Sequence, residues 1–314
     1  MERNARIYIA GHTGLIGSAI HRRVEQAGMH ALFCPRAALD LTDGAMVERF
    51  FAEAQPDYVV LAAGKVGGIA ENLAYPVDFL RENLTIQLNV LAAAHRARVK
   101  KLIFFGSSCM YPRDCPQPMA ETALLTGQPE PSSLAYAVAK LAGVQMCLAY
   151  NQQYSAPRFI PVIPNSVYGP NDHFGPRGHV LSALIQRFHE ARLAGHREVT
   201  LWGTGTPRRE FIHADDLAEA CFALLARDTE LLPLPLNIGA GVDVSIRELA
   251  THIAAITGFA GELSWDTSRP DGAPRKLLDS SRMRGFGWTP RVTLEAGLRE
   301  TYQWYQQNAA ACLA

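Results

Sequence analysis

The sequence has no excess of charge of either sign, no long hydrophobic run and no apolar segment at its N-terminus. Its 30 Lys and Arg residues balance its 30 Asp and Glu residues, which argues against binding to nucleic acid or to an anionic membrane through net charge. Because no run of about 18 apolar residues is present, neither a transmembrane helix nor a signal peptide is predicted. We therefore expect a cytoplasmic protein with no membrane or nucleic-acid partner.

Cysteine is also sparse and widely spaced. The 6 cysteines include no C-x-x-C pair, so the sequence predicts no metal site and no disulfide framework. We expect most of them to be buried thiols. They are Cys34, Cys109, Cys115, Cys147, Cys221 and Cys312.

Up to residue 165, short apolar runs alternate regularly with longer helical segments. The apolar runs are RIYIA, ALFC, YVVLAA, KLIFF and RFIPVI. The helical segments cover residues 15–28, 43–54, 77–98 and 134–154. This alternation predicts an α/β fold of the Rossmann type, in which βαβ units wind into a doubly wound parallel sheet covered on both faces. We expect residues 1–165 to form this domain.

Beyond residue 165 the alternation gives way to loops that are rich in proline and glycine. The loops cover residues 168–178, 202–209 and 269–274, and helical patterns lie at 179–194, 214–227, 245–257 and 293–308. Such a composition suits a smaller lobe whose loops close over a ligand. We expect residues 166–314 to form mainly this C-terminal lobe, with some segments returning to the first domain.

The first apolar run leads directly into GHTGLIG, which places Gly11, Gly14 and Gly17 at the start of the first helix. Glycines at a strand end let the backbone approach a pyrophosphate, and the helix N-terminus directs its free N–H groups toward it. A tight turn with close helix packing is the alternative explanation. The position between strand and helix favours a dinucleotide site.

The end of the second apolar run indicates which dinucleotide is bound. ALFCPR offers no carboxylate for the ribose hydroxyls of an adenosine and instead supplies Arg36, a residue type suited to a 2′-phosphate. NADP(H) is therefore favoured over NAD, and the alternative reading of Arg36 is a solvated loop charge. Asp40 could hydrogen-bond the adenine region or cap the helix that begins near Asp43.

YAVAK places Tyr136 and Lys140 four residues apart, and therefore on one face of a helix. There an ammonium can stabilise a tyrosinate and make the phenol a better proton donor. The pair alone is common in helices by chance, but Ser107 adds a hydroxyl in the GSS that follows KLIFF. Together the residues predict a carbonyl-reduction site. Ser107 would hydrogen-bond the carbonyl oxygen and Tyr136 would protonate it, while Lys140 would tune Tyr136 and could bind the nicotinamide ribose.

With these motifs the chain resembles the extended short-chain dehydrogenase/reductases, and among them the GDP-L-fucose synthase family. The resemblance runs from the first strand to TYQWY and is carried most narrowly by KVGGI, GSSCMYP and PDGAPRKLLD. It implies a 3,5-epimerase and 4-reductase that converts GDP-4-keto-6-deoxy-D-mannose to GDP-L-fucose with NADPH. It also implies a homodimer formed through the helices at 77–98 and 134–154.

The resemblance gives a role to Cys109, which directly follows the serine pair. In similar enzymes the cysteine at this place removes protons from the carbons beside the ketone, and a histidine matching His179 supplies them on the opposite face. This chemistry is sound because a 4-keto group acidifies C3 and C5, and Ser107 and Tyr136 can stabilise the enolate. His173 is the rival acid if the match is displaced. Taken alone, Cys109 would be read as a buried core thiol.

The resemblance also implies substrate-binding residues in the C-terminal lobe. It matches Arg187 and Arg209 to the diphosphate or the sugar. It matches Lys276 to the nucleotide portion, and Trp202 to a place on or near the guanosine or the sugar. Asp271 would accept from guanine N1 and N2, or would hold a turn.

The sequence departs from the family pattern at two places. Relatives commonly read PTNLYGP where this chain reads PNSVYGP, so Asn165 lies one position early and Ser166 takes the usual asparagine position. We transfer substrate binding to neither residue. In the glycine loop, Thr13 replaces a basic residue of some relatives, which leaves Arg36 as the main candidate for the 2′-phosphate.

Three other functions stay open from the sequence. The same chemistry on another GDP-4-keto sugar, a 3,6-dideoxy sugar or a heptose, would use the same mechanism. A UDP-hexose 4-epimerase shares Ser107, Tyr136 and Lys140, but its reaction needs no acid and base at the ring carbons, so Cys109 and His179 argue against it. A dinucleotide-binding scaffold without catalysis is disfavoured because the Ser-Tyr-Lys set is intact.

Overall fold

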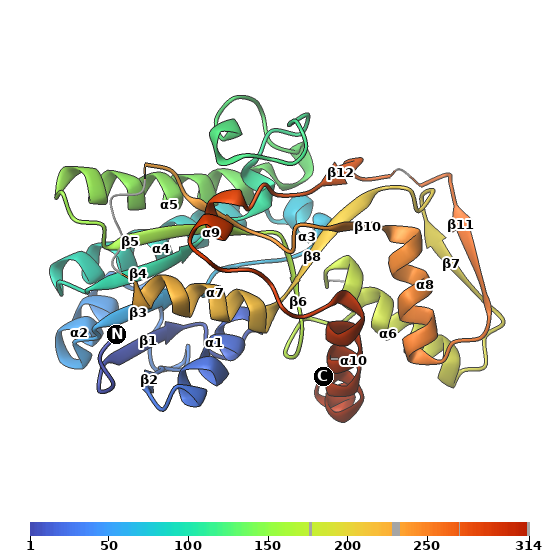
Figure 1. The fold of residues 1–314 in the computed structure, drawn as a ribbon, viewed down its shortest axis with the longest axis horizontal. Coiled ribbons are helices and arrows are strands. Elements are labelled where there is room, and N and C mark those ends of the chain that lie inside the picture. The colour runs from blue at the N-terminus through green and yellow to red at the C-terminus, as the bar shows by residue number, and fades with distance from the viewer. Residues whose placement is uncertain (176–177, 228–232, 270, 313–314) are drawn as a thin grey trace.

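A computed structural model describes residues 1–175, 178–227, 233–269 and 271–312, which form two regions that lie side by side (Figure 1). The first region is built on a six-stranded sheet. Its strands, in spatial order, are β2 (His30–Leu32), β1 (Arg6–Ala10), β3 (Tyr58–Leu61), β4 (Lys101–Phe105), β5 (Phe159–Pro164) and β9 (Leu236–Ile238). Neighbouring strands pair in parallel throughout, which confirms the predicted Rossmann-type fold.

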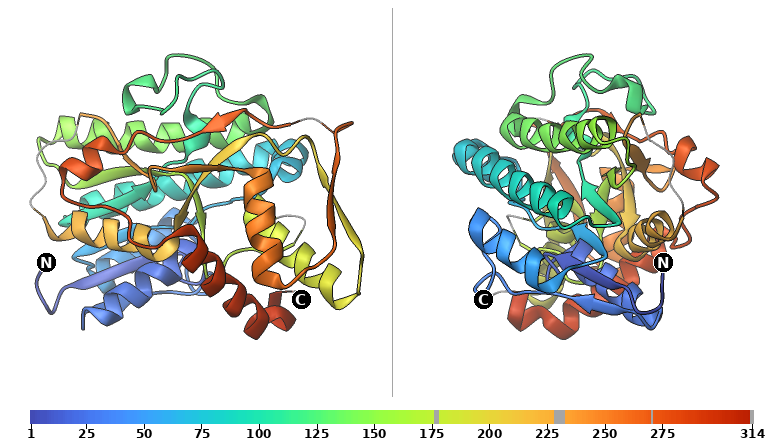
Figure 2. Two further views of the ribbon diagram at one scale, coloured as in Figure 1. Left: turned by 45° about the vertical axis from the view of Figure 1, so that its right-hand side comes forward. Right: turned by 90° about the vertical axis from the view of Figure 1, so that its left-hand side faces the viewer.

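Helices cover both faces of this sheet (Figure 2). One layer contains α1 (Leu15–Gln26) and α7 (Ala214–Ala226), which pack against each other. The other contains α2 (Gly44–Ala54), α4 (Pro76–Arg96) and α5 (Leu134–Gln153). Strand β1 shows why both layers are needed, because Ile7 and Ile9 enter the core beneath α1 and α7 while Tyr8 and Ala10 enter the opposite core. A strand that is buried on both faces is typical of a parallel sheet.

The C-terminal lobe has short strands and its own aromatic core. Strand β8 (Arg208–His213) pairs with β6 (Ser166–Tyr168), β10 (Asp243–Ser245) and β12 (Arg275–Lys276), and β7 (Glu198–Trp202) pairs with β11 (Glu262–Asp266). Helices α6 (Val180–Leu193), α8 (Ile246–Thr257) and α10 (Leu294–Cys312) pack around these strands. Their buried side chains form a separate cluster that includes Tyr168, Phe188 and Tyr305. The lobe is therefore stabilised by a core of its own.

Local sequence explains where several helices begin and end. The side chain of Asp43 accepts from the backbone N–H groups of Ala45 and Met46, so α2 begins directly after Asp43. Ser245 and Glu248 form a capping box at the start of α8, and Gly258 ends that helix with a φ of +74°. Such caps satisfy N–H groups that the first turn of a helix leaves free.

Some elements differ from the sequence prediction. The short helix α3 (Ile69–Ala74) precedes α4 and was not predicted, and neither was the two-residue strand β12. The place of β9 in the first sheet is consistent with the expected return of some later segments to the first domain. Residues 202–209, predicted as a loop, contain the last residue of β7 and the first two of β8. The strands were missed because strands this short carry too few residues for an alternating pattern to appear in the sequence.

The cysteines follow the buried-thiol prediction in part. Cys115, Cys147 and Cys221 are buried free thiols, whereas Cys34 and Cys109 are partly exposed. The side chain of Cys312 lies outside the described residues.

Residues Pro131–Gln153 form one stretch that is long and apolar enough to cross a membrane by length and composition. It contains α5, whose residues Ala137, Ala139 and Val144 are fully buried. Because α5 packs on α4 and on β4 and β5, its apolar character has an explanation inside the fold.

Candidate active site

The strand order of the first sheet reverses direction at β1. Strand β1 pairs with β2 on one side and with β3 on the other, so the direction in which the chain adds strands reverses there. In open α/β sheets, ligands bind outside the carboxyl ends of the strands at this point. The predicted glycine turn follows β1, and Ser107 follows β4, so both lie at this edge.

The glycine turn has the shape that a pyrophosphate site requires. Gly11 has a φ of +85°, and a Cβ atom there would lie 2.8 Å from the backbone nitrogen of Ala63. A Cβ on Gly17 would lie 2.0 Å from the carbonyl oxygen of Gly11. Gly14 is the N-cap residue of α1, whose first turn has no side-chain cap and no acidic residue. The free N–H groups of this helix end therefore fit an anionic cofactor.

Arg36 and Asp40 lie beyond β2, on the side of the sheet next to the glycine turn. Arg36 is exposed, as a residue that meets a phosphate at the surface must be. The carboxylate of Asp40 accepts from the backbone N–H of Thr42 at 2.9 Å and from its hydroxyl at 2.8 Å, and these hydrogen bonds lower the pKa of Asp40. Asp40 therefore holds a turn, and the helix cap that was considered for it is supplied by Asp43.

Ser107 and Tyr136 meet although 29 positions separate them in the chain. Ser107 ends the segment after β4, and its hydroxyl accepts from the backbone N–H of Cys109 at 3.3 Å. Burial raises the pKa of Tyr136, and the charge of Cys109 raises it further, whereas a hydrogen bond with Ser107 lowers it. The phenol therefore keeps its proton at neutral pH, as a proton donor must.

Lys140 lies one helical turn after Tyr136 and is buried. Its ammonium lies 5.9 Å from the centre of the Tyr136 ring and 5.2 Å from that of Phe104. Burial lowers the pKa of Lys140 to about 8. Burial is the largest influence on the pKa of Tyr136, and the tuning of this phenol by Lys140 stays a prediction.

The thiol of Cys109 faces two cations from the other region of the molecule. Cys109 lies in a short 3-10 turn, Ser108–Met110, and its Sγ atom lies 4.0 Å from the Nζ atom of Lys276 on β12. Burial lowers the pKa of Arg209, while the charges of Cys109 and Asp271 raise it. The sequence predicted Lys276 and Arg209 as substrate ligands and did not predict that they lie beside the cysteine.

His179 and His173 flank the same buried carboxylate. His179 is the exposed N-cap residue of α6, and His173 is also exposed. The backbone N–H of His173 donates to Asp172 at 2.7 Å, and Ser182 donates to the same carboxylate. Burial raises the pKa of Asp172, against the effects of the Ser182 hydrogen bond and the charge of His179. Both candidate histidines therefore lie near the carboxyl group of Asp172, and this geometry does not choose between them.

The remaining predicted substrate residues gather around one end of β7. Arg187 donates to the carbonyl oxygen of Thr200 at 2.5 Å, and Trp202 is 68% exposed. The carboxylate of Asp271 accepts from the backbone N–H of Thr204 at 2.9 Å and from its hydroxyl at 2.7 Å. These bonds favour the turn-holding interpretation of Asp271, and they lower its pKa.

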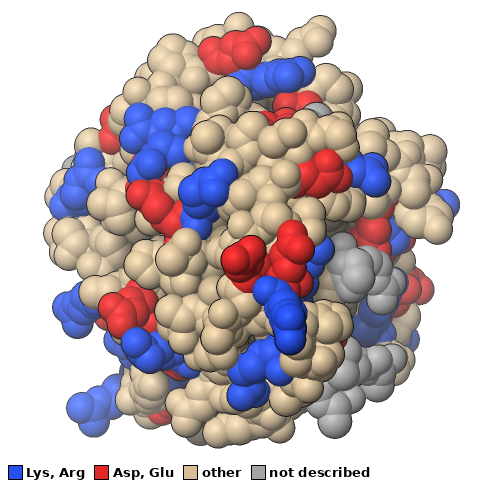
Figure 3. All heavy atoms as spheres, turned by 90° about the vertical axis from the view of Figure 1, so that its right-hand side faces the viewer, with Lys and Arg blue, Asp and Glu red and all other residues tan. Residues whose placement is uncertain are grey.

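Charge on the face of the C-terminal lobe is mixed rather than concentrated. Figure 3 shows Lys and Arg interspersed with Asp and Glu over this face.

Sequence reasoning missed a buried polar group behind the site. Glu210 is fully buried on β8, next to Arg209, and its carboxylate accepts from Asn165 at 2.8 Å. The only signal in the sequence was a glutamate within REFIH, and a charged residue in such a short run is usually read as exposed.

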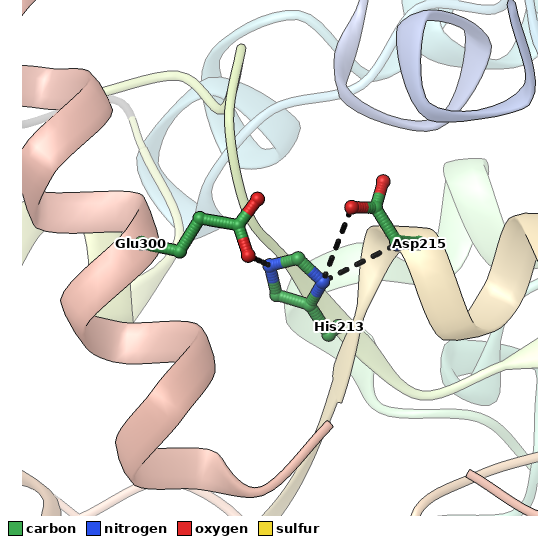
Figure 4. Close-up of side chains that lie close together, drawn as sticks. All are labelled: His213, Asp215 and Glu300. Carbon is green, nitrogen blue, oxygen red and sulfur yellow. Dashed lines mark hydrogen bonds and ion pairs between the residues drawn. The ribbon is translucent and has the colours of Figure 1, made fainter. Parts of the chain in front are cut away.

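A second cluster of titratable groups lies where the two regions join (Figure 4). The buried ring of His213 stands between Asp215, which is 3.9 Å from Nδ1, and Glu300, which is 3.8 Å from Nε2. Their potential ligand atoms lie within 4.8 Å of one another. The two carboxylates approach different ring nitrogens, so one ion could reach only one of those nitrogens. Burial lowers the pKa of His213, so at neutral pH the arrangement is a neutral ring between two carboxylates rather than a chelating site.

Known proteins resemble this chain over nearly its whole length. A profile of the NAD dependent epimerase/dehydratase family matches residues 7–239. The chain is 51% identical over 309 residues to GDP-L-fucose synthase 1 from Arabidopsis thaliana, which covers 98% of this chain and 95% of the relative. It is 46% identical to GDP-L-fucose synthase from Escherichia coli, over 96% of this chain and 97% of the relative.

A solved structure shows the same fold with a cofactor. The GDP-mannoheptose C4 reductase from Campylobacter jejuni, with NADP bound, superimposes with a TM-score of 0.89 at 38% identity, over 98% of this chain and 99% of that one. This likeness extends across both regions of the molecule.

Proposed function

The chain belongs to the NAD dependent epimerase/dehydratase family, and from this premise we propose that it converts GDP-4-keto-6-deoxy-D-mannose to GDP-L-fucose by 3,5-epimerisation and NADPH-dependent 4-reduction. The observation that carries the proposal is the position of Cys109. Its thiol lies in the turn that begins at Ser107, beside the phenol of Tyr136 and 4.0 Å from the ammonium of Lys276. A carbonyl reductase alone has no need of a thiol at this place.

We propose NADP(H) as the cofactor. The turn at Gly11 and Gly17 and the open N-terminus of α1 suit its pyrophosphate, and exposed Arg36 suits a 2′-phosphate. The bound cofactor supplies the hydride for C4 of the sugar. The buried ammonium of Lys140 would hold the nicotinamide ribose.

In the reduction, Ser107 and Tyr136 act on the oxygen at C4. The Ser107 hydroxyl hydrogen-bonds this oxygen, and the Tyr136 phenol donates its proton to it as negative charge develops. The raised pKa of Tyr136 keeps the phenol protonated until that moment. Lys140 would stabilise the tyrosinate that remains.

In the epimerisation, Cys109 and His179 act on the carbons beside the ketone. The Cys109 thiolate takes a proton from C3 or C5, and the resulting negative charge moves onto the oxygen that Ser107 and Tyr136 already bind. His179, as its imidazolium, returns a proton to the opposite face of the same carbon. The thiol then loses its proton to solvent and the histidine regains one. Reduction comes last because it removes the ketone that makes these protons acidic.

We further propose a division of labour between the two regions. Residues 1–165, with β9 and α7, would hold the cofactor, and most of residues 166–314 would hold the GDP-sugar. Arg187 and Arg209 suit the diphosphate, Lys276 lies close enough to Cys109 to reach a diphosphate or a sugar, and exposed Trp202 offers an aromatic face. Asp271 would hold the loop beside them.

The second candidate is the same chemistry on another GDP-4-keto sugar. It is favoured by the likeness to a protein described as a GDP-mannoheptose C4 reductase, which shares 38% of its residues with this chain. A 3,6-dideoxy sugar belongs to the same class. A UDP-hexose 4-epimerase would leave the Cys109–Lys276 contact without a purpose.

Product analysis tests the proposal directly. Purified protein with GDP-4-keto-6-deoxy-D-mannose and NADPH should oxidise NADPH and yield GDP-L-fucose by NMR, and NADH should serve less well. Parallel reactions with the heptose and 3,6-dideoxy substrates, and with a UDP-hexose and NAD, compare the alternatives. If NADPH is not oxidised with the fucose precursor, the proposal is wrong.

We also propose that the protein is a cytoplasmic homodimer joined through α4 and α5. Both helices expose large apolar side chains, namely Val77, Leu88, Leu134 and Val138. A second copy that packs α4 and α5 into a four-helix arrangement would cover them. Sedimentation should give twice the mass of one chain, and Leu88→Glu should shift the protein toward a monomer.

A further inference from the structure

Asn165 lies immediately behind the proposed cysteine base, and every hydrogen-bonding position of its amide except one acceptor lone pair is in use. Its side chain is 4% exposed. The amide Oδ1 accepts from the hydroxyl of Ser108 at 3.0 Å. The two N–H groups on Nδ2 donate to Glu210 at 2.8 Å and to the carbonyl oxygen of Lys276 at 3.1 Å. Asn165 therefore has no free donor to offer a substrate.

Glu210 is the second member of this arrangement, and three donors hold it in place. Its Oε2 atom accepts from Asn165 and from the backbone N–H of Leu278 at 3.0 Å, and its Oε1 atom accepts from the backbone N–H of Gly241 at 2.7 Å. Gly239 lies so close that a Cβ there would be 2.4 Å from Oε1. The carboxylate thus connects β8 to the segments that follow β9 and β12.

The three segments that Asn165 and Glu210 connect each carry a residue of the proposed site. Ser108 precedes Cys109, Glu210 follows Arg209, and the bonded carbonyl belongs to Lys276 itself. We propose that Asn165 and Glu210 are a pair of positioning residues that fix the Cys109 thiol opposite the Lys276 ammonium and the Arg209 guanidinium.

Geometry explains why such a pair is needed. Lys276 lies on a two-residue strand, and 167 positions separate it from Cys109, so neither local structure nor an extended ladder sets their distance. The contact of 4.0 Å between the ammonium and the sulfur weakens as the two drift apart, because water enters between them. A buried amide that bonds to both sides can hold that distance. The inference rests on the proposed role of Cys109, but its test needs no sugar.

The test measures how fast Cys109 is alkylated by iodoacetamide, resolved by peptide mass spectrometry. Only the thiolate reacts, so the rate reports the cations that face Cys109. Cys34 is also partly exposed and lies in the cofactor region, so it serves as a reference thiol in the same molecule. Lys276→Met measures the effect of losing the ammonium directly. We expect it to slow alkylation of Cys109 at neutral pH by about 3- to 10-fold.

Asn165→Ala should slow Cys109 alkylation in the same direction, by a smaller factor, and leave Cys34 unchanged. The matched control is Asn151→Ala. Asn151 is equally buried and makes two hydrogen bonds to the backbone of Phe159, at the amino end of β5 and thus at the opposite edge of the sheet from Cys109. It should lower the melting temperature without changing the rate at Cys109. Glu210→Gln keeps the volume of the side chain and one acceptor, and it should also slow alkylation of Cys109. If Asn165→Ala does not fold, Glu210→Gln is the variant that tests the proposal.

The proposal is overturned if folded Asn165→Ala or Glu210→Gln alkylates like the wild type, if Asn151→Ala has the same effect, or if Lys276→Met has none. Turnover of the fucose precursor by the wild type is a separate measurement. If the protein shows the expected alkylation pattern but makes no GDP-L-fucose, the proposal about the positioning pair stands and the proposed function is wrong.

Discussion

The two halves of the proposed site differ in how they are built. The reduction half stands on one region, with Ser107 at the end of β4 and Tyr136 and Lys140 on α5, which packs on that sheet. The proton-transfer half is divided, with Cys109 in the first region and exposed His179 at the start of α6 in the C-terminal lobe. Reduction therefore relies on one rigid core, whereas epimerisation depends on how the two regions meet.

This difference suggests how one fold carries two activities. Residues that bind the ketone oxygen would be needed in both reactions, and they lie at the carboxyl edge of a buried parallel sheet. Residues that act only on C3 and C5 lie around this edge, in a short turn and at the start of a helix. Epimerisation could therefore be lost through changes in the C-terminal lobe that leave reduction intact.

The largest effect should come from removing the base of the proton-transfer half. Cys109→Ser replaces a thiolate with a hydroxyl that is not ionised at neutral pH, so exchange of the C3 and C5 protons with deuterated solvent should fall about 10³-fold or more. NADPH binding should be unchanged because Cys109 is not part of the glycine turn. NMR of the recovered GDP-sugar measures the exchange, and unchanged exchange would return Cys109 to the class of structural thiols.

The next largest effect should fall on the other half. Tyr136→Phe removes the proton donor, so NADPH oxidation should slow about 10²- to 10³-fold. The absorbance of the reduced nicotinamide measures this rate. Proton exchange should survive in part, because Ser107 still binds the ketone oxygen. Equal losses of exchange and reduction would mean that the two halves are not separable.

How much of this site could be predicted depended on sequence distance. Gly11 and Gly17 act within one turn, and Tyr136 and Lys140 within one helical turn, so local spacing indicated them, and both the fold class and the family are confirmed. The contact between Lys276 and Cys109 and the burial of Glu210 depend on pairing between distant short strands. A single sequence contains no local pattern for such pairing. The catalytic roles themselves stay predictions.

A smaller effect should identify the histidine of the C-terminal lobe. His179→Gln should slow exchange about 10- to 100-fold while leaving NADPH oxidation of an already epimerised sugar nearly unchanged. His173→Gln is the matched control, because His173 and His179 are both exposed and both lie near Asp172. If His173→Gln is the slower variant, the predicted pairing of His179 with Cys109 is wrong and His173 is the acid.

The smallest effect concerns the junction between the two regions at His213. Burial lowers the pKa of His213, as does Arg22 on α1, against Glu300 on α10 and Asp215 and Asp216 on α7. An unfolded histidine titrates near pH 6.5, so between that pH and the lower folded pKa the unfolded chain binds the extra proton. The contribution of His213 to stability is therefore present above about pH 6.5 and is lost as the pH falls through the folded pKa.

His213→Gln should flatten this part of the profile of melting temperature against pH, whatever its effect at neutral pH. The buried carboxyls of Asp172 and Glu210 have raised pKa values, so they lose stabilisation as the pH rises and act in the opposite direction. The difference between wild type and variant, rather than either curve alone, isolates the histidine. If the junction aligns Cys109 with His179, the pH profile of proton exchange should differ between the wild type and His213→Gln, whereas the pH profile of reduction should not. Equal differences in both reactions would show that the two halves share one rigid frame.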